Sequence, residues 1–274
     1  MRLATVISNG VPTPVAELDG ALVPLDVPAG TTVADLIAGG GALPSPAAGA
    51  APLADAVLAA PLAPGKIVAI GLNYMDHIRE ANMATPTSPL VFTKFTSSVI
   101  ASGDVIRVDR AITRRVDWEV ELAAVVGRRM TRVSRADALS HVFGYTVAND
   151  VSARDVQFAD GQWVRGKSLD TFCPLGPVIV TADEIDDPQA LALRTRVNGE
   201  TVQDSNTQEM VFGVAELLSF CSHSFTLEPG DVVLTGTPWG CGEFMDPIRS
   251  LADGDVVEVE VEGIGTVTNT VAEI

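Results

Sequence analysis

Two glutamates separated by one residue are the strongest chemical signal in this sequence. Glu119 and Glu121 lie in the apolar stretch 116–127, which has the composition of a buried β-strand. Side chains alternate between the two faces of a strand, so both carboxylates project from the same face. Burying two like charges together is costly unless a cation compensates them, and a divalent metal with oxygen ligands would do so. The alternative is an edge strand with a solvated acidic face.

A third carboxylate, Asp150, ends the strand-like run 143–150. A carboxylate at the end of a strand can reach an ion that a neighbouring strand holds. Three carboxylates together with water molecules suit octahedral Mg²⁺ or Mn²⁺, which keep positions for substrate oxygens. Because residues 151–154 follow directly, the alternative is that Asp150 caps a helix or a turn. The residues alone leave both interpretations open.

A histidine and a glutamate offer acid–base chemistry. His77 and Glu80 lie three positions apart in a helix predicted over residues 74–83, so they share one face of it. A carboxylate bonded to one imidazole nitrogen fixes the tautomer and leaves the other nitrogen to take a proton from water. The alternative is an exposed surface pair.

Lysine is rare in this chain, and one lysine has an unusual setting. Of the 18 lysines and arginines, only Lys66, Lys94 and Lys167 are lysine. Lys167 lies among small and apolar residues, where an ammonium can polarise a carbonyl or hold a carboxylate. The alternative is a surface lysine with its charged end in water.

A glycine-rich segment, residues 235–242, follows a predicted strand. It lacks the Gly-Lys-Ser/Thr ending of a phosphate-binding loop, so nucleotide binding is not predicted. The backbone N–H groups around Gly236 and the hydroxyl of Thr237 can instead bind a carboxylate.

Composition excludes several classes of partner. The 274 residues are 47% hydrophobic and carry a net charge of −17, which disfavours binding to nucleic acid or to an anionic membrane surface. No apolar run reaches the roughly 18 residues of a membrane span. The start of the chain is predicted to be a first strand, not a secretory signal. Three scattered cysteines, Cys173, Cys221 and Cys241, predict neither disulfides nor a thiolate zinc site, which favours a cytoplasmic location.

The hydrophobic pattern predicts a β-dominated α+β fold with few helices. The division predicted is a small N-terminal β-rich domain with a linker, residues 1–62, and a catalytic domain, residues 63–274. Helices are predicted at residues 32–37, 53–60, 74–83, 135–139 and 207–220. Strands are predicted at residues 67–70, 90–95, 105–108, 119–126, 143–149, 178–181, 193–197, 231–235, 255–261 and 265–271.

Six motifs follow one another in a fixed order. They are Gly-Leu-Asn-Tyr-x-x-His-x-x-Glu (71–80), Asp-x-Glu-x-Glu-Leu (117–122), Asn-Asp-Val-Ser-Ala-Arg-Asp-x-Gln (149–157), Lys-Ser-x-Asp-Thr-Phe-x-Pro-x-Gly-Pro (167–177), Val-Asn-Gly-Glu (197–200) and Pro-Gly-Asp-Val-Val-Leu-Thr-Gly-Thr-Pro (229–238). Over about residues 67–271 this pattern strongly resembles the fumarylacetoacetate hydrolase superfamily, in its acylpyruvate hydrolase and 2-hydroxyhepta-2,4-diene-1,7-dioate isomerase-like branch.

The resemblance implies a mixed β-roll catalytic domain that forms a homodimer and binds Mg²⁺ or Mn²⁺, with Ca²⁺ as a substitute in a crystal. It implies that a segment carrying the acid–base pair orders over the ligand. The roles it implies are metal ligation by Glu119, Glu121 and Asp150, catalysis by His77, Glu80 and Lys167, and substrate contact by Asn73, Arg154, Gln157, Gly236 and Thr237. Two departures, Cys241 in place of a frequent valine and the segment 243–249, bear on substrate identity.

The function expected from these signals is metal-dependent hydrolysis of a C–C bond in a 3-acylpyruvate-like 2-oxo acid, as in aromatic compound catabolism. His77 would activate the water, and the metal and Lys167 would stabilise the departing enolate. The same enolate chemistry leaves oxaloacetate decarboxylation and the isomerisation or hydration of unsaturated 2-oxo dioic acids as alternatives. A non-catalytic module that binds metal and a 2-oxo acid is the alternative from another class. The expected partner is a small anionic 2-oxo acid.

Overall fold

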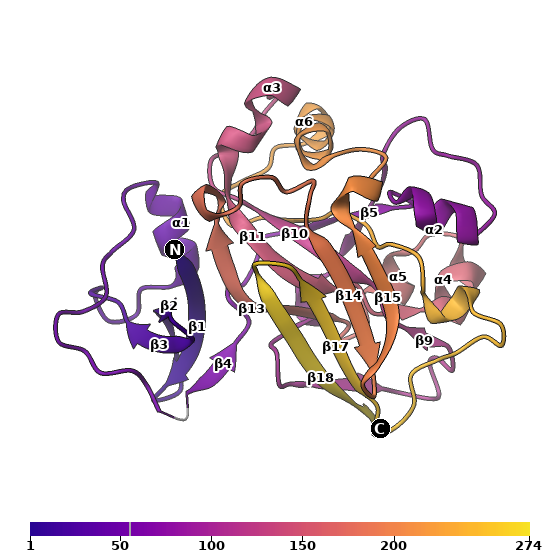
Figure 1. Cartoon of the computed structure of the whole chain (residues 1–274), viewed down its shortest axis with the longest axis horizontal. Helices are drawn as coiled ribbons and strands as arrows, with labels where there is room; N and C mark the ends of the chain where they lie inside the picture. Colours follow the sequence, from indigo (N-terminus) through magenta and orange to yellow (C-terminus); the bar gives the residue numbers. More distant parts are fainter. Residues whose placement is uncertain (55) are drawn as a thin grey trace.

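Two β-sheets pack against each other and carry few helices (Figure 1). The computed structural model describes residues 1–54 and 56–274. The prediction of a β-dominated fold is confirmed. Among the described residues, none of the helices combines the length and the apolar character that a membrane crossing requires.

The larger sheet mixes antiparallel pairs with a parallel pair between β16 and β5. Its main path runs through β3 (Ala21–Pro24), β2 (Val11–Leu18), β1 (Arg2–Ser8), β13 (Cys173–Thr181), β11 (Val142–Asn149), β10 (Val120–Val126), β16 (Val232–Leu234), β5 (Ile67–Gly71) and β6 (Leu90–Lys94). Two short strands join it from the side: β4 (Val57–Ala59) pairs with β1, and β7 (Val99–Ile100) pairs with β13.

The smaller sheet has five strands, in the order β15 (Glu200–Asn206), β14 (Ala192–Val197), β17 (Val256–Val261), β18 (Gly265–Glu273) and β8 (Val105–Val108). A separate two-stranded ladder pairs β12 (Ser152–Ala153) with β9 (Val116–Asp117). Strand β15 was not predicted because its sequence is polar. Its only signal is the Asn198-Gly199 turn, where both residues have positive φ, as a tight hairpin requires.

The helices are short and lie at the ends and edges of the sheets (Figure 1). They are α1 (Val33–Gly39), α2 (Met75–Glu80), α3 (Arg135–Ala138), α4 (Arg154–Asp160), α5 (Val164–Lys167) and α6 (Val214–Ser224). Helix α1 begins where predicted because Thr32 caps it: its hydroxyl accepts from the Asp35 N–H, and Asp35 accepts from the Thr32 N–H in return.

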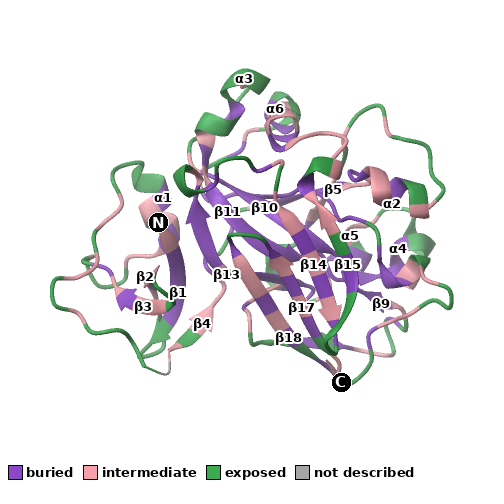
Figure 2. Ribbon diagram, viewed as in Figure 1, coloured by how far each residue is buried: buried purple, intermediate pink, exposed green. Residues whose placement is uncertain are grey.

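Strand β10 is buried along its whole length, whereas β17 alternates between buried and more exposed residues (Figure 2). One face of β10, with Val120 and Leu122, belongs to a core that also includes Val257 and Val259 of β17. Its other face packs in a second cluster with Val33 and Ile37 of α1. Because both faces of β10 are covered, its side chains are shielded from water. The alternative of an edge strand with a solvated acidic face is therefore wrong.

The N-terminal segment is β-rich, as predicted, and it extends the larger sheet through the pairing of β1 with β13. The division at residue 62 stays a prediction. The helix predicted over residues 53–60 is wrong where the structure describes that range, and residue 55 lies outside the described residues. Residues 57–59 form β4 instead, because their backbone pairs with Thr5–Ile7 of β1.

The helix predicted over residues 207–220 is interrupted. A short 3₁₀ turn spans Thr207–Glu209, and α6 begins only at Val214. The interruption has a tertiary cause: Asn73 accepts from the Phe212 N–H at 2.9 Å and donates to the Phe212 carbonyl at 3.0 Å. These bonds hold residue 212 to another part of the fold and prevent it from continuing a helix.

Candidate metal and active site

Three buried carboxylates meet where β10 and β11 pair. Glu119 precedes β10, Glu121 lies within it, and Asp150 directly follows β11. The register places Val120 opposite Asn149, so the Asp150 N–H donates to the Glu119 carbonyl at 2.9 Å. One oxygen from each of the three carboxylates lies within 4.8 Å of the others. The structure therefore brings the three predicted metal ligands together.

Two side-chain amides hold the backbone at the start of β10. The Glu119 N–H donates to Asn149 Oδ1 and the Val120 N–H donates to Gln203 Oε1, both at 3.0 Å. The Asn149 side chain, and not a strand carbonyl, accepts the Glu119 N–H, which is why β10 begins one residue later than predicted. Gln203, on the unpredicted strand β15, also donates to the Thr237 hydroxyl at 2.9 Å.

Two buried lysines reach into the carboxylate cluster. Lys167 Nζ donates to Glu119 Oε2 at 2.7 Å and to Asp150 Oδ2 at 2.8 Å, so the alternative of a surface lysine is wrong. Lys94 Nζ donates to Asp150 Oδ1 at 2.6 Å and to the Lys167 carbonyl. Lys94 was not assigned to the site from the sequence, and its one signal was the scarcity of lysine in the chain.

A buried arginine joins the cluster to a neighbouring turn. Arg154, at the start of α4, donates through Nε to Asp117 Oδ2 at 2.8 Å, and its Nη2 lies 2.7 Å from Glu119 Oε1. Asp117 also accepts the N–H groups of Gly242 and Glu243. Asp117 thereby ties the turn near residue 242 to the carboxylate cluster, a role that the sequence motif did not reveal.

The buried charges of the cluster do not balance. The groups are the carboxylates of Asp117, Glu119, Glu121 and Asp150 and the cations Lys94, Lys167 and Arg154. The excess negative charge falls on Glu121. Among the described residues, the hydrogen-bond donor to its carboxylate is the Gly236 N–H, at 2.6 Å. Burial raises the pKa of Glu121 well above its usual value, and the Asp150 and Glu119 carboxylates raise it further. A divalent cation fits this position, since it would satisfy the unpaired carboxylate.

The ionisation of the neighbouring groups is fixed by their partners. Burial opposes the charge on Glu119, but Lys167 and Arg154 outweigh it and lower the pKa of Glu119 to about 2. Burial likewise lowers the pKa of Lys167, yet the Asp150 and Glu119 carboxylates outweigh burial and hold it above its usual value. Glu119 is therefore an anion and Lys167 a cation at neutral pH.

The acid–base pair lies on α2, beside this cluster. His77 is buried, and its Nδ1 lies 2.8 Å from Glu80 Oε1, so the alternative of an exposed pair is wrong. Both Glu80 oxygens accept the Gly240 N–H, at 3.1 and 2.9 Å. The edge of the His77 ring meets Phe244, with the ring centroids 5.2 Å apart. These contacts fix the imidazole and leave Nε2 free of the Glu80 bond.

A cavity of about 260 Å³ joins the pair to the cluster. Its polar lining residues are His77, Glu119, Arg154, Gln157, Lys167 and Thr237. Its apolar lining residues include Ile70, Leu72, Met83, Phe92, Phe158, Trp163 and Phe244, and they lie among the polar ones, since Lys167 Nζ is 5.4 Å from the centre of the Phe92 ring. The cavity thus offers charged groups for an anion and apolar contacts for a carbon chain.

Two residues predicted to contact substrate are already bonded within the protein. Asn73 bonds to the backbone of Phe212 and donates to the Thr235 carbonyl at 2.8 Å. The Gly236 N–H is used by Glu121, and Gly236 has a φ of 96°, with Asn73 Cβ 2.9 Å from where a side chain would begin. Both residues support the site through these internal bonds, and their direct contact with substrate stays a prediction.

Comparison with known proteins gives one family. The family profile described as Fumarylacetoacetate (FAA) hydrolase C-terminal matches residues 66–272. A protein of Xenopus laevis named as a mitochondrial oxaloacetate tautomerase is 50% identical over 210 residues, which are 76% of this chain and 66% of that protein. The chain thus spans about two thirds of the length of that curated relative.

Solved structures show the same fold over the full chain. A fumarylacetoacetate hydrolase from Exiguobacterium antarcticum superposes with a TM-score of 0.93 at 39% identity, covering 100% of both chains. A 2-hydroxyhepta-2,4-diene-1,7-dioate isomerase from Mycobacterium marinum superposes with a TM-score of 0.83 at 38% identity, covering 100% of this chain and 98% of the other.

Proposed function

This chain belongs to the fumarylacetoacetate hydrolase family, and we propose that it is a divalent-metal-dependent enzyme that moves a proton next to the carbonyl of a small 2-oxo acid. The reaction proposed is the interconversion of enol and keto forms, as the name of the Xenopus relative describes for oxaloacetate. The family contains hydrolases, isomerases and tautomerases, so the alternative of a non-catalytic module is not favoured.

The uncompensated carboxylate of Glu121 is the observation that carries this proposal. With all four carboxylates ionised, the buried cluster has one excess negative charge, and a divalent ion changes that excess to one positive charge. A positive site attracts an anionic substrate although the whole chain carries a charge of −17. The acidic surface is screened beyond a Debye length of about 8 Å, whereas contacts inside the cavity are not.

The chain's own residues have separate tasks in this reaction. Glu119, Glu121 and Asp150 would hold the divalent ion, which would supply stabilisation of the negative charge that develops on the 2-oxo group. Lys167, held as a cation, adds a second positive charge to the lining of the cavity. His77, oriented by Glu80, takes the proton from the carbon beside the carbonyl and returns it to the oxygen of the resulting enolate, which gives the enol; the reverse steps convert the enol to the keto form.

Hydrolysis of a C–C bond in a 3-acylpyruvate is the second candidate. The His77–Glu80 pair favours it, because a fixed imidazole can equally take a proton from water. The resulting hydroxide would add to the distal carbonyl, and the bond between the acyl carbon and the pyruvate methylene would break to give a carboxylic acid and pyruvate. The apolar lining residues of the cavity suit the acyl chain of such a substrate. Oxaloacetate decarboxylation and isomerisation of unsaturated 2-oxo dioic acids share the same enolate.

A panel of 2-oxo acids separates these candidates. Enol–keto conversion of oxaloacetate, pyruvate release from acylpyruvates and carbon dioxide release from oxaloacetate are each followed with Mg²⁺ or Mn²⁺, with the free metal as the reference. We expect enol–keto conversion to exceed the reference by the largest factor. If pyruvate release shows the largest factor, hydrolysis replaces tautomerisation as the assignment. Rates equal to the reference in all three assays would contradict an enzyme of this kind.

Replacing Lys167 by methionine is expected to lower kcat/KM for 2-oxo acids by about 10²- to 10³-fold, the usual cost of losing one group that stabilises developing negative charge. The kcat/KM for esters that lack the 2-oxo carboxylate should change much less. Lys66→Met is the matched control, because Lys66 is half-exposed and pairs with Asp231 away from the cavity. An equal loss for both substrate types, or no loss, would contradict the role of Lys167.

The segment 74–89 is expected to close over bound ligand. Residues 82–85 are exposed, yet Met83 also lines the cavity, so ligand binding would cover its apolar side chain. Amide hydrogen exchange measured with and without an oxalate-like inhibitor tests this, and we expect slower exchange of this segment in the complex. Unchanged exchange would show that the segment is not a lid.

The protein is also expected to form a homodimer, as the family resemblance implies. Sedimentation at micromolar protein concentration should give twice the mass of the 274-residue chain. A sedimenting monomer would contradict this expectation. The cytoplasmic location stays a prediction, and the Xenopus relative is named as mitochondrial.

A further inference from the structure

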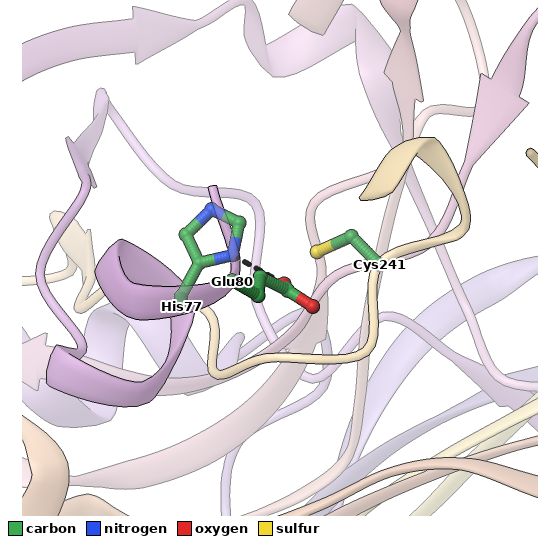
Figure 3. Close-up of side chains that lie close together, drawn as sticks. All are labelled: His77, Glu80 and Cys241. Carbon is green, nitrogen blue, oxygen red and sulfur yellow. Dashed lines mark hydrogen bonds and ion pairs between the residues drawn. The ribbon is translucent and has the colours of Figure 1, made fainter. Parts of the chain in front are cut away.

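A second group of metal-ligating side chains lies beside the carboxylate cluster. His77, Glu80 and Cys241 each offer one ligand atom within 4.8 Å of the other two. Figure 3 shows the Cys241 sulfur directed toward the Glu80 carboxylate, which in turn contacts His77. Cys241 lies far from His77 and Glu80 in the sequence, so the three residues do not form a recognisable zinc-binding sequence motif. The thiol has no task in the reaction proposed above.

The donor atoms differ in kind from those of the carboxylate cluster. Glu119, Glu121 and Asp150 offer oxygens alone, which suit Mg²⁺ and Mn²⁺. The second group offers one nitrogen, one oxygen and one sulfur, a set typical of Zn²⁺ and of ions that share its geometry. We propose that His77, Glu80 and Cys241 bind a thiophilic divalent ion, Zn²⁺ or Co²⁺, and that this ion inhibits the enzyme.

The backbone holds two of the three ligands together in advance. The Gly240 N–H bonds to both Glu80 oxygens, and Cys241 is the next residue. Gly240 has a φ of 95°, and a Cβ there would lie 2.0 Å from the Val202 carbonyl oxygen, so only glycine fits. Little rearrangement is therefore needed to bring the carboxylate and the thiol to one ion.

The ion has a route to this group and a clear consequence there. Of the three ligands, only His77 lines the cavity, so an ion would have to enter beside its ring to reach Glu80 and the buried Cys241, and a water can complete a four-coordinate ion. Binding at His77 Nδ1 moves the single ring proton from Nδ1 to Nε2, and the Cys241 thiol proton passes to solvent. With Nε2 protonated, His77 can no longer take a proton from the substrate as a base. The inhibition rests on the proposed function, whereas the binding does not.

Cobalt absorption tests the binding without any activity assay. The full chain is first saturated with Mg²⁺ to fill the carboxylate cluster, and Co²⁺ is then added. We expect a near-ultraviolet thiolate-to-cobalt charge-transfer band in the unmodified chain and in Cys221→Val, whose buried thiol lies on α6. The band should be lost in Cys241→Val and in His77→Ala. No band in the unmodified chain, or a band that persists in Cys241→Val, would overturn the proposal.

Zinc inhibition tests the consequence. Each protein is assayed with Mg²⁺ in excess, with and without micromolar Zn²⁺, and is compared with its own zinc-free rate. We expect zinc to lower turnover by about 10²-fold, the lower range for loss of a general base, in the unmodified chain and in Cys221→Val. In Cys241→Val the loss should fall below about threefold. Equal inhibition of Cys221→Val and Cys241→Val would show that zinc acts at another site. A cobalt band in a protein without any turnover would refute the proposed function without contradicting the ion site.

Discussion

Replacing His77 by alanine is expected to lower the turnover of 2-oxo acids by about 10²- to 10⁴-fold, the usual contribution of a positioned general base. The reason is geometric, because His77 is the imidazole that lines the cavity beside Glu119 and Lys167. The loss should fall on kcat, with little change in metal affinity or in the binding of an oxalate-like inhibitor, because the base acts only on the reacting proton. Steady-state kinetics and inhibitor titration measure the two effects separately.

His223→Ala is the matched control for this variant. His223 is exposed on α6, and its Nδ1 contacts the Ser219 carbonyl outside the cavity. The turnover of His223→Ala should stay within about threefold of the turnover of the unmodified chain. If His77→Ala loses less than about threefold, the base is another group. If inhibitor binding falls as far as kcat, His77 has a structural role in place of the chemical one.

Replacing Glu121 by glutamine is expected to remove the divalent ion and, with it, most of the activity. An amide is a poor ligand, and the change also removes the excess negative charge that makes the cluster attract a cation. The unmodified chain should gain about 2.7 kcal/mol of stability when the metal is present at about 100-fold over its Kd, whereas Glu121→Gln should gain little. Thermal unfolding with metal and with EDTA measures both.

Without metal, the Glu121→Gln substitution is expected to have the opposite effect on thermal stability. Without metal, Glu121→Gln should melt at the same temperature as the unmodified chain or higher, because the variant no longer buries an uncompensated carboxylate. Glu228→Gln, on the surface, should keep the full metal effect. A variant that melts lower without metal, and that still gains full stability with it, would show that Glu121 is not a ligand.

Local patterns predicted much of the carboxylate cluster. The alternation of a strand was enough to place Glu119 and Glu121 on one face, and the apolar residues around them indicated burial. Asp150 was harder, because its position depends on the register that pairs Val120 with Asn149. That register is a tertiary property, so the link from Asp150 to the cluster came from the family resemblance and not from spacing.

The missed residues are those whose roles arise only from distant contacts. Lys94 touches Asp150 because β6 and the end of β11 approach each other in space. Asp117 acts through the turn at residue 242, and Gly240 orients Glu80 from a position remote in sequence. No local pattern of charge or hydrophobicity reports such bonds. The wrong helix over residues 53–60 has the same cause, since pairing with β1 overrides local preference.

The proposed activity is that this chain, with a divalent ion in its carboxylate cluster, moves a proton beside the carbonyl of a 2-oxo acid. The ultraviolet rate of enol-to-keto conversion of oxaloacetate tests it, measured with chelator-stripped protein, with Mn²⁺ alone, and with both together. We expect acceleration by at least about 10²-fold over Mn²⁺ alone only when protein and metal are combined. A stripped protein that is equally fast, or a combination no faster than Mn²⁺ alone, would contradict it.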